Sequence, residues 1–158
     1  MLNYNSPIND SKEYNNLKIS EVESTFKINL RGKKREFITN IGKILSIIPP
    51  IEPNTSSQNK ELNLLWLSPD EWMLYSNELM KKNSDDKIET ELINSISKLN
   101  YGSVTNVTDQ WVMINIKGDN VYELLSSSCP FNFTSFKSKN GYVVQTIVNH
   151  IDVIIHNK

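Results

Sequence analysis

The sequence predicts an α+β protein with a mainly antiparallel sheet and two to three packed helices. Three observations support this class: polar and apolar residues alternate at strand spacing, other segments place apolar residues at helical spacing, and short turn sequences join several predicted strands directly. Because hairpins and helices are mixed along the chain, an antiparallel sheet is favoured over a repeating parallel one.

Each element of the first half is predicted from its own pattern. Apolar positions alternate from Val22 to Leu30, which is typical of a half-buried strand. Apolar residues recur at helical spacing over residues 37–48, and Pro49-Pro50 is expected to end that helix because proline lacks a backbone donor. Residues 62–75 read as strand–turn–strand, with Ser68-Pro69-Asp70-Glu71 as the turn.

The second half is predicted in the same way. A helix capped by Ser84 is expected to run to Leu99, and a second, shorter helix is expected to stop at Pro130. Residues 107–116 are apolar on both faces, which favours a central strand. Two final strands are predicted over 142–148 and 151–155.

Length, charge and cysteine content limit the possible functions. The 158 residues include 17 basic and 18 acidic ones, and a net charge of −1 argues against a strongly electropositive nucleic-acid partner. No apolar run approaches the ~20 residues needed to span a bilayer, and the first residues lack the pattern of a signal peptide. We therefore expect a cytoplasmic protein with a flexible or partner-docking arm over residues 1–20 and a single domain over 21–158.

Candidate catalytic and metal-binding residues are few. The adjacent carboxylates Asp70 and Glu71 lie in a predicted turn, where neighbouring side chains diverge. His150 and His156 are roughly 20 Å apart on an extended chain, too far to share one metal ion. Cys129 has no basic neighbour in sequence that would activate its thiol, so a buried, inert side chain is expected. The residues alone therefore predict no active site and no metal site.

Several segments resemble the gamma subunit of heterotetrameric sarcosine oxidase. Residues 64–74, with Trp66, Pro69, Asp70, Glu71 and Trp72, resemble the family's L-W-L-G-P-D-E-W-L-L block. Matching pieces follow in the same order: Pro53-Asn54-Thr55, residues 104–109 ending in Asp109, the Cys129-Pro130 pair, and Gln145-Thr146. The chain departs from the family pattern at Ser68 and Ser128, which replace glycines, and at Asn106, which replaces an aspartate. By this comparison a further strand and a C-terminal helix are expected beyond Ile155.

The resemblance implies a fold similar to the folate-binding domain of the glycine-cleavage aminomethyltransferase and a structural role without a cofactor in this chain. Such oxidases demethylate sarcosine to glycine, yielding hydrogen peroxide and formaldehyde, or methylenetetrahydrofolate when folate is present. The partners implied are alpha, beta and delta subunits, which would hold FAD, FMN, NAD, tetrahydrofolate and zinc. The motif residues named above, Trp66 to Gln145, would serve folding or partner contact.

Two other interpretations stay open. The chain could be the corresponding subunit of a related N-methyl amino acid dehydrogenase, such as N-methylglutamate dehydrogenase, since only the large subunits determine the substrate. It could also be a stand-alone folate-binding domain, for which Asp109 is the one candidate ligand carboxylate, although a turn or capping aspartate is the simpler interpretation.

Overall fold

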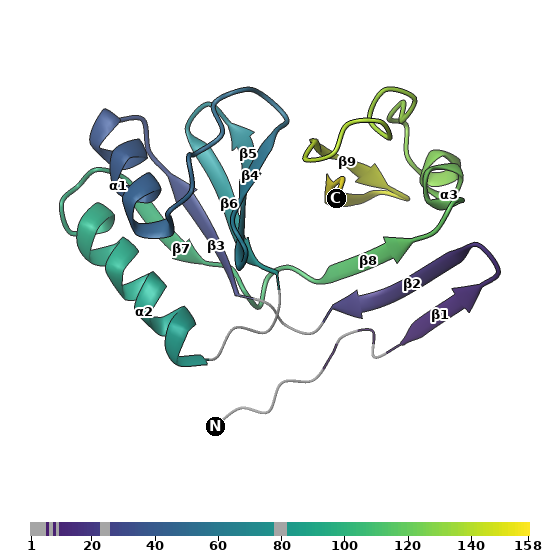
Figure 1. Cartoon of the computed structure of the whole chain (residues 1–158), viewed down its shortest axis with the longest axis horizontal. Helices are drawn as coiled ribbons and strands as arrows, with labels where there is room; N and C mark the ends of the chain where they lie inside the picture. Colours follow the sequence, from purple (N-terminus) through teal and green to yellow (C-terminus); the bar gives the residue numbers. More distant parts are fainter. Residues whose placement is uncertain (1–5, 7, 9, 23–25, 78–81) are drawn as a thin grey trace. The chain divides into compact units, whose positions relative to one another are not determined.

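The chain forms two compact units (Figure 1). The computed structural model describes residues 6, 8, 10–22, 26–77 and 82–158. Residues 25–111 make up one unit, here called the central unit, and residues 1–24 with 112–158 make up the other, the terminal unit. The terminal unit therefore combines segments from both halves of the chain.

The central unit is built on a five-stranded antiparallel sheet. Its strands occur in the order β4-β5-β6-β3-β7. Their bounds are Ser56–Gln58 for β4, Leu62–Ser68 for β5, Glu71–Ser76 for β6, Lys27–Arg31 for β3 and Ser103–Asn106 for β7. The strand–turn–strand unit predicted over 62–75 is thus present as the β5–β6 hairpin. Of the strand predicted over 22–30, residues 23–25 lie outside the described residues.

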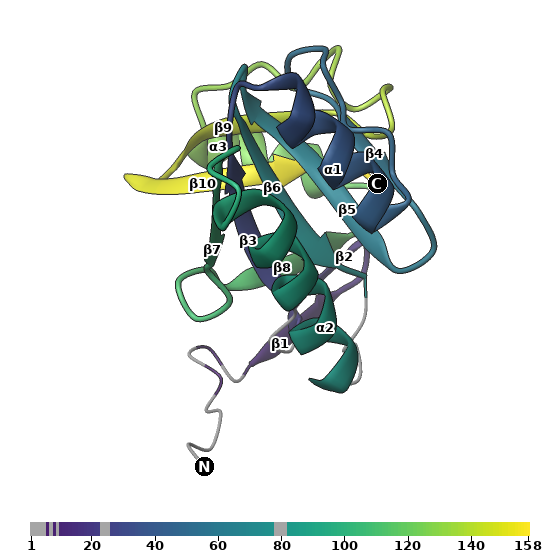
Figure 2. The same ribbon diagram turned by 90° about the vertical axis from the view of Figure 1, so that its left-hand side faces the viewer.

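Helices cover one face of this sheet, as Figure 2 shows for α1 and α2. Helix α1 spans Arg35–Leu45, and α2 spans Lys82–Leu92 and continues as a π-helical turn, η1, over Ile93–Ser97. The apolar side chains of α1 and η1 pack against those of β3, β5 and β6 in one core. Amphipathic spacing predicted the presence of both helices, though not their ends, because this buried stripe holds each of them on the sheet.

Helix α1 ends earlier than Pro49-Pro50 would require. Its C-cap is Ser46, which adopts a left-handed conformation with φ 52°. Ile48, predicted on the apolar face of the helix, is therefore outside it and 86% exposed. The predicted end was wrong because a left-handed cap, which serine rarely forms, stops the helix before the prolines are reached.

The terminal unit contains two smaller antiparallel sheets and one helix. Strands β1, β2 and β8 form one sheet, and β9 and β10 form the other. The elements are β1 (Ser11–Tyr14), β2 (Leu17–Val22), β8 (Met113–Lys117), α3 (Val121–Ser128), β9 (Val143–Val148) and β10 (Ile151–His156). Side chains from β8, α3, β9 and β10 join in a second core around Phe133 and Phe136. The predicted fold class, α+β with mainly antiparallel sheets, is confirmed.

The N-terminal segment is more regular than the sequence suggests. Within and just after the predicted arm, residues 11–22 form a β-hairpin whose second strand pairs with β8, Ile19 lying opposite Ile116. Residues 1–5, 7 and 9 of the predicted arm lie outside the described residues. This ladder joins positions far apart in the sequence, so no local pattern in residues 1–20 could indicate it.

The central strand predicted over 107–116 is wrong. Residues 103–106 form β7 at the edge of the central sheet, residues 108–110 form a turn, and 113–117 form β8 in another sheet. Val107 and Trp111, on either side of this turn, are each at least partly buried, which accounts for the apolar pattern.

Among the described helices, none has the length and apolar character that crossing a bilayer requires.

Candidate functional site

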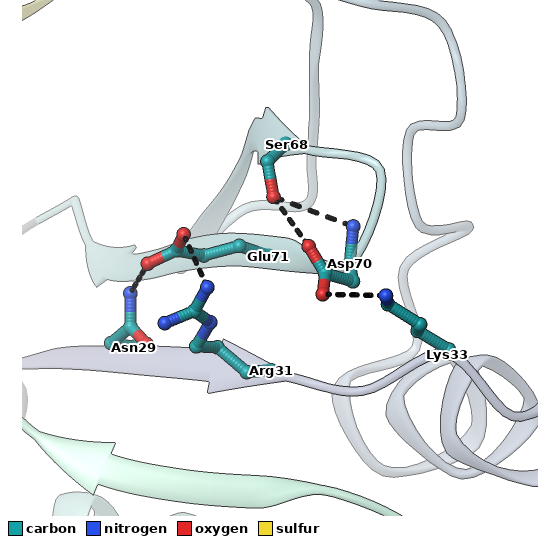
Figure 3. Close-up of polar contacts among 6 residues, drawn as sticks. All are labelled: Asn29, Arg31, Lys33, Ser68, Asp70 and Glu71. Carbon is teal, nitrogen blue, oxygen red and sulfur yellow. Dashed lines mark hydrogen bonds and ion pairs between the residues drawn. The ribbon is translucent and has the colours of Figure 1, made fainter.

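The Ser-Pro-Asp-Glu segment forms the tight turn of the β5–β6 hairpin (Figure 3). Ser68 pairs with Glu71 across the turn, and Pro69 is exposed at its tip. The Ser68 hydroxyl donates a hydrogen bond of 2.8 Å to Oδ1 of Asp70 and accepts one of 3.4 Å from the Asp70 backbone N–H. Ser68, at the position of a glycine in the family pattern, therefore stabilises the turn through two hydrogen bonds with Asp70.

Basic and amide groups from β3 and the turn after it surround the two carboxylates. Asn29 donates a 2.7 Å hydrogen bond to Oε1 of Glu71, and Arg31 Nη2 lies 3.7 Å from Oε2 of the same side chain. Lys33 Nζ lies 3.6 Å from Oδ2 of Asp70. Figure 3 shows that the two carboxylates turn toward different partners. They do not form the paired acid and base that a catalytic dyad needs.

The electrostatics of this turn favour the charged aspartate. The Ser68 hydrogen bond is the largest cause that lowers the pKa of Asp70, and the charges of Lys33 and Arg31 act in the same direction. A backbone hydrogen bond of 2.9 Å from Gly32 N–H to the carbonyl of Asp70 adds a contact that no substitution of side chains removes. The arrangement braces the β5–β6 turn against the start of α1.

The two motif tryptophans lie opposite each other on β5 and β6 but differ in burial. Trp72 is 2% exposed in the core of the central unit, with its ring centroid 5.7 Å from that of Phe37. Trp66 is partly buried against the same core. Trp72 therefore has the contacts of a folding residue, and Trp66 retains an accessible portion.

Asp109 lies exposed in the turn after β7. Its charge acts on Lys27, a β3 lysine that is only 4% exposed. Burial is the largest influence on Lys27 and lowers its pKa, while Asp109 opposes that shift. The Lys27 backbone N–H also donates to the hydroxyl of Thr108 at 3.1 Å, so this turn packs directly on β3.

The Cys-Pro and Gln-Thr motifs meet in the terminal unit. Cys129 is the C-cap of α3 and is buried, with Sγ 3.4 Å from the hydroxyl of Thr146 on β9. Pro130, which is exposed, follows the helix end as predicted. Gln145 is exposed on β9, beside Thr146 but on the opposite face of the strand. The sequence motifs thus fall into two groups, one in each unit.

Sequence reasoning missed four residues. Asn29, Arg31 and Lys33 complete the polar cluster, and Lys27 is buried although it alternates with apolar positions as a solvent-facing residue would. Lys27, Asn29 and Arg31 face β6 through strand register, which local patterns do not give, and Lys33 follows in the turn after β3. Within the described part of the chain, no group of three or more His, Cys, Asp or Glu side chains is placed to hold a metal ion.

Comparison with known proteins identifies the family. The model of the sarcosine oxidase gamma subunit family matches residues 35–158. Among solved structures, a chain of the heterotetrameric sarcosine oxidase from Corynebacterium sp. U-96, in complex with pyrrole 2-carboxylate, is similar with a TM-score of 0.75 and 18% sequence identity. The match covers 87% of this chain and 68% of that chain, and it shows a shared fold. A search of curated proteins finds no match. The chain belongs to the sarcosine oxidase gamma subunit family.

Proposed function

We propose that this chain is the non-catalytic gamma subunit of a heterotetrameric sarcosine oxidase. The complex would oxidatively demethylate sarcosine to glycine, giving hydrogen peroxide and formaldehyde or methylenetetrahydrofolate. The observation that carries the proposal is the family match over residues 35–158, supported by the similar fold of a chain from a heterotetrameric enzyme. In this proposal the alpha, beta and delta subunits are the partners, and the complex works in the cytoplasm.

The polar contacts of the motif residues support a structural role. Asp70 and Glu71 are each engaged by their own hydrogen-bond and ion-pair partners in the hairpin turn, and Cys129 is buried against β9. Residues engaged in this way stabilise the fold that partners recognise. We accordingly assign FAD, FMN, NAD, tetrahydrofolate and zinc to the partner subunits in this proposal.

A rigid apolar loop in the central unit also fits a subunit that binds others. Ile48 and Ile51 are 86% and 74% exposed, while Pro49 and Pro50 between them are buried. The carbonyl of Pro50 accepts the indole hydrogen bond of Trp72, so the loop is fixed before any partner binds. Preorganised apolar side chains lose little conformational entropy on association.

Native mass spectrometry of the chain co-expressed with the products of its neighbouring genes tests the proposal. We expect a flavin-containing assembly with one copy each of four different chains, and sarcosine-dependent hydrogen peroxide production by that assembly. A lone 18.2 kDa monomer beside partners that assemble fully without it would overturn the proposal. A complete assembly that oxidises N-methylglutamate and not sarcosine would keep the subunit role and correct the substrate.

Titration of the isolated chain with tetrahydrofolate tests the stand-alone alternative. We expect no binding by calorimetry at concentrations at which a folate-binding domain would be saturated. Saturable binding that Asp109→Asn weakens would replace the structural role with a folate-binding one.

A further inference from the structure

A groove of about 820 Å³ lies within the terminal unit, between the β1–β2 hairpin and α3. One side is formed by Glu13 and Tyr14 at the end of β1, and the other by Asn120, Glu123, Leu124 and Ser127. The four residues of the second side are spaced i, i+3, i+4 and i+7, so the N-cap residue Asn120 and the three helical residues lie along one face of α3. Leu125 of the same helix is buried in the core, so the groove is lined by the face of α3 that the core leaves uncovered.

The two sides of the groove are fixed to each other by backbone contacts. The backbone N–H of Asn120 donates to the carbonyl of Asn16 in the hairpin turn at 3.4 Å. Gly118 adopts a φ of +126°, and a Cβ there would lie 2.1 Å from that same carbonyl oxygen. Only glycine allows the backbone to come this close. Next to this contact, Lys18 on β2 pairs with Lys117 on β8, the end of the ladder between the two strands. The groove is therefore part of the folded unit and does not have to be formed by a ligand.

The side chains of the groove combine apolar surface with negative charge. Tyr14 is 58% exposed and Leu124 is 37% exposed, so a large side chain on each side of the groove offers apolar surface. Glu13 and Glu123 add two carboxylates, and no lysine or arginine is among the described residues that line the groove. Lys18 reaches Glu13 from outside at 3.4 Å, but an exposed ion pair of this kind is weak and easily exchanged for another cation.

We infer that this groove binds a segment of another subunit of the complex, one that places a large apolar side chain beside a lysine or arginine. The inference rests on the proposed function. The apolar side chain packs between Tyr14 and Leu124, and the cationic group pairs with Glu123. A buried apolar contact with a charged group at its edge is the arrangement that gives protein interfaces both affinity and orientation.

A paired substitution on α3 tests the inference. Glu123→Lys with Leu124→Ser reverses the charge and removes the apolar contact at two partly exposed positions, so the subunit keeps its fold and circular dichroism spectrum. The matched control, Glu91→Lys with Leu99→Ser, makes the same changes at exposed positions of the central unit. We expect the groove variant to bind the remaining subunits roughly tenfold or more weakly than wild type, while the control binds like wild type. Equal Kd values for the groove variant and wild type would overturn the inference.

The outcome is separable from that of the proposed function. If wild-type chain does not enter the complex at all, the proposed function fails; if wild type assembles and the groove variant assembles equally well, only the groove assignment fails. Photocrosslinking of the assembled complex through Tyr14→p-benzoylphenylalanine adds a direct readout. A crosslink to a partner-subunit peptide that contains a large apolar residue next to lysine or arginine supports the inference, and a crosslink to a second copy of this chain overturns it.

Discussion

The indole N–H of Trp72 donates a hydrogen bond of 2.8 Å to the carbonyl oxygen of Pro50, 22 positions earlier in the chain. This bond links the second strand of the motif hairpin to the buried Pro-Pro segment that follows α1. Both partners are removed from water, so the bond cannot be replaced by solvent when it is lost. The tryptophan of the family motif thus holds a loop as well as filling the core.

Removing the indole donor should destabilise the chain. Trp72→Phe keeps an aromatic ring against Phe37 but leaves the buried Pro50 carbonyl without its donor, and we expect a loss of about 1–3 kcal/mol in the free energy of unfolding. Urea denaturation measures it. Trp66→Phe is the matched control, because Trp66 is only partly buried, and it should cost less. Equal losses for both variants would contradict the role given to the Pro50 bond.

Replacing Ser68 by alanine should raise the pKa of Asp70. The Ser68 hydroxyl is the main cause of the lowered pKa, and alanine removes it while leaving Lys33 in place. A lowered aspartate pKa adds stability above the pKa of the unfolded chain, and this is lost as the pH falls through the folded value. The Ser68→Ala variant should therefore lose less stability on acidification. NMR titration of the Asp70 carboxyl measures the shift; an unchanged pKa would show that the lysine dominates.

Acid should destabilise the terminal unit through His156 at the end of β10. Burial, and secondarily the charge of Lys158, lowers the pKa of His156 from 6.5 to about 4. The unfolded chain then binds more protons between these values, so stability is complete above about pH 6.5 and falls toward pH 4, by on the order of 3 kcal/mol. Denaturation curves of His156→Asn across this range should be flatter than those of wild type. His150→Asn, in the exposed β9–β10 turn, is the control and should retain the wild-type slope.

The thiol of Cys129 should be inaccessible in the folded chain. It lies buried at the end of α3 against Thr146. We expect reaction with Ellman's reagent to be slow in buffer and complete at once in guanidinium chloride, because only unfolding exposes the sulfur. Rapid labelling of the native chain would contradict its placement in the core.

An added methyl group at Gly118 should loosen the contact between the β1–β2 turn and α3. Gly118→Ala forces a Cβ against the Asn16 carbonyl and strains a positive φ, and we expect a loss of about 1–3 kcal/mol. Gly42→Ala inside α1 is the control: its Cβ meets the Ile47 carbonyl oxygen at 3.4 Å and alanine favours helix, so stability should stay the same or rise. Thermal unfolding followed by circular dichroism compares the two.

The sequence predicted elements whose side chains follow one local period, and failed where conformation depends on a distant partner. The β5–β6 hairpin and α3 were found because their apolar spacing and turn residues agree. Strands were also predicted over 142–148 and 151–155, and Asn149 and His150 between them both adopt the positive φ that a tight hairpin turn requires, without any glycine. The run over 107–116 misled because only its last four residues belong to a strand, β8, while residues 108–110 form a turn that separates them from Val107.

In the candidate site, too, local sequence predicted the turn residues but not the partners that distant strands supply. Asp70 and Glu71 were placed in a turn from the segment Ser68-Pro69-Asp70-Glu71; the structure has Asp70 in the turn and Glu71 as the first residue of β6. Their partners Asn29 and Arg31 depend on the register of β3 against β6, a pairing between positions forty or more residues apart, which composition does not encode. The burial of Lys27 depends equally on tertiary contacts and carries no local signal.

The terminal unit is made of two segments that the central unit separates in the sequence, and this order has a consequence for biosynthesis. Lys18 on β2 pairs with Lys117 on β8, so the second strand of this ladder is translated 99 positions after the first. At ordinary elongation rates roughly 5–20 s separate the emergence of β2 and of β8 from the ribosome, and all of residues 25–111 emerge within this interval. The central unit can complete its sheet in that time, while the β1–β2 hairpin waits with an unpaired edge. Nascent chains of this family member should therefore depend on chaperone protection of their first residues until β8 has been synthesised.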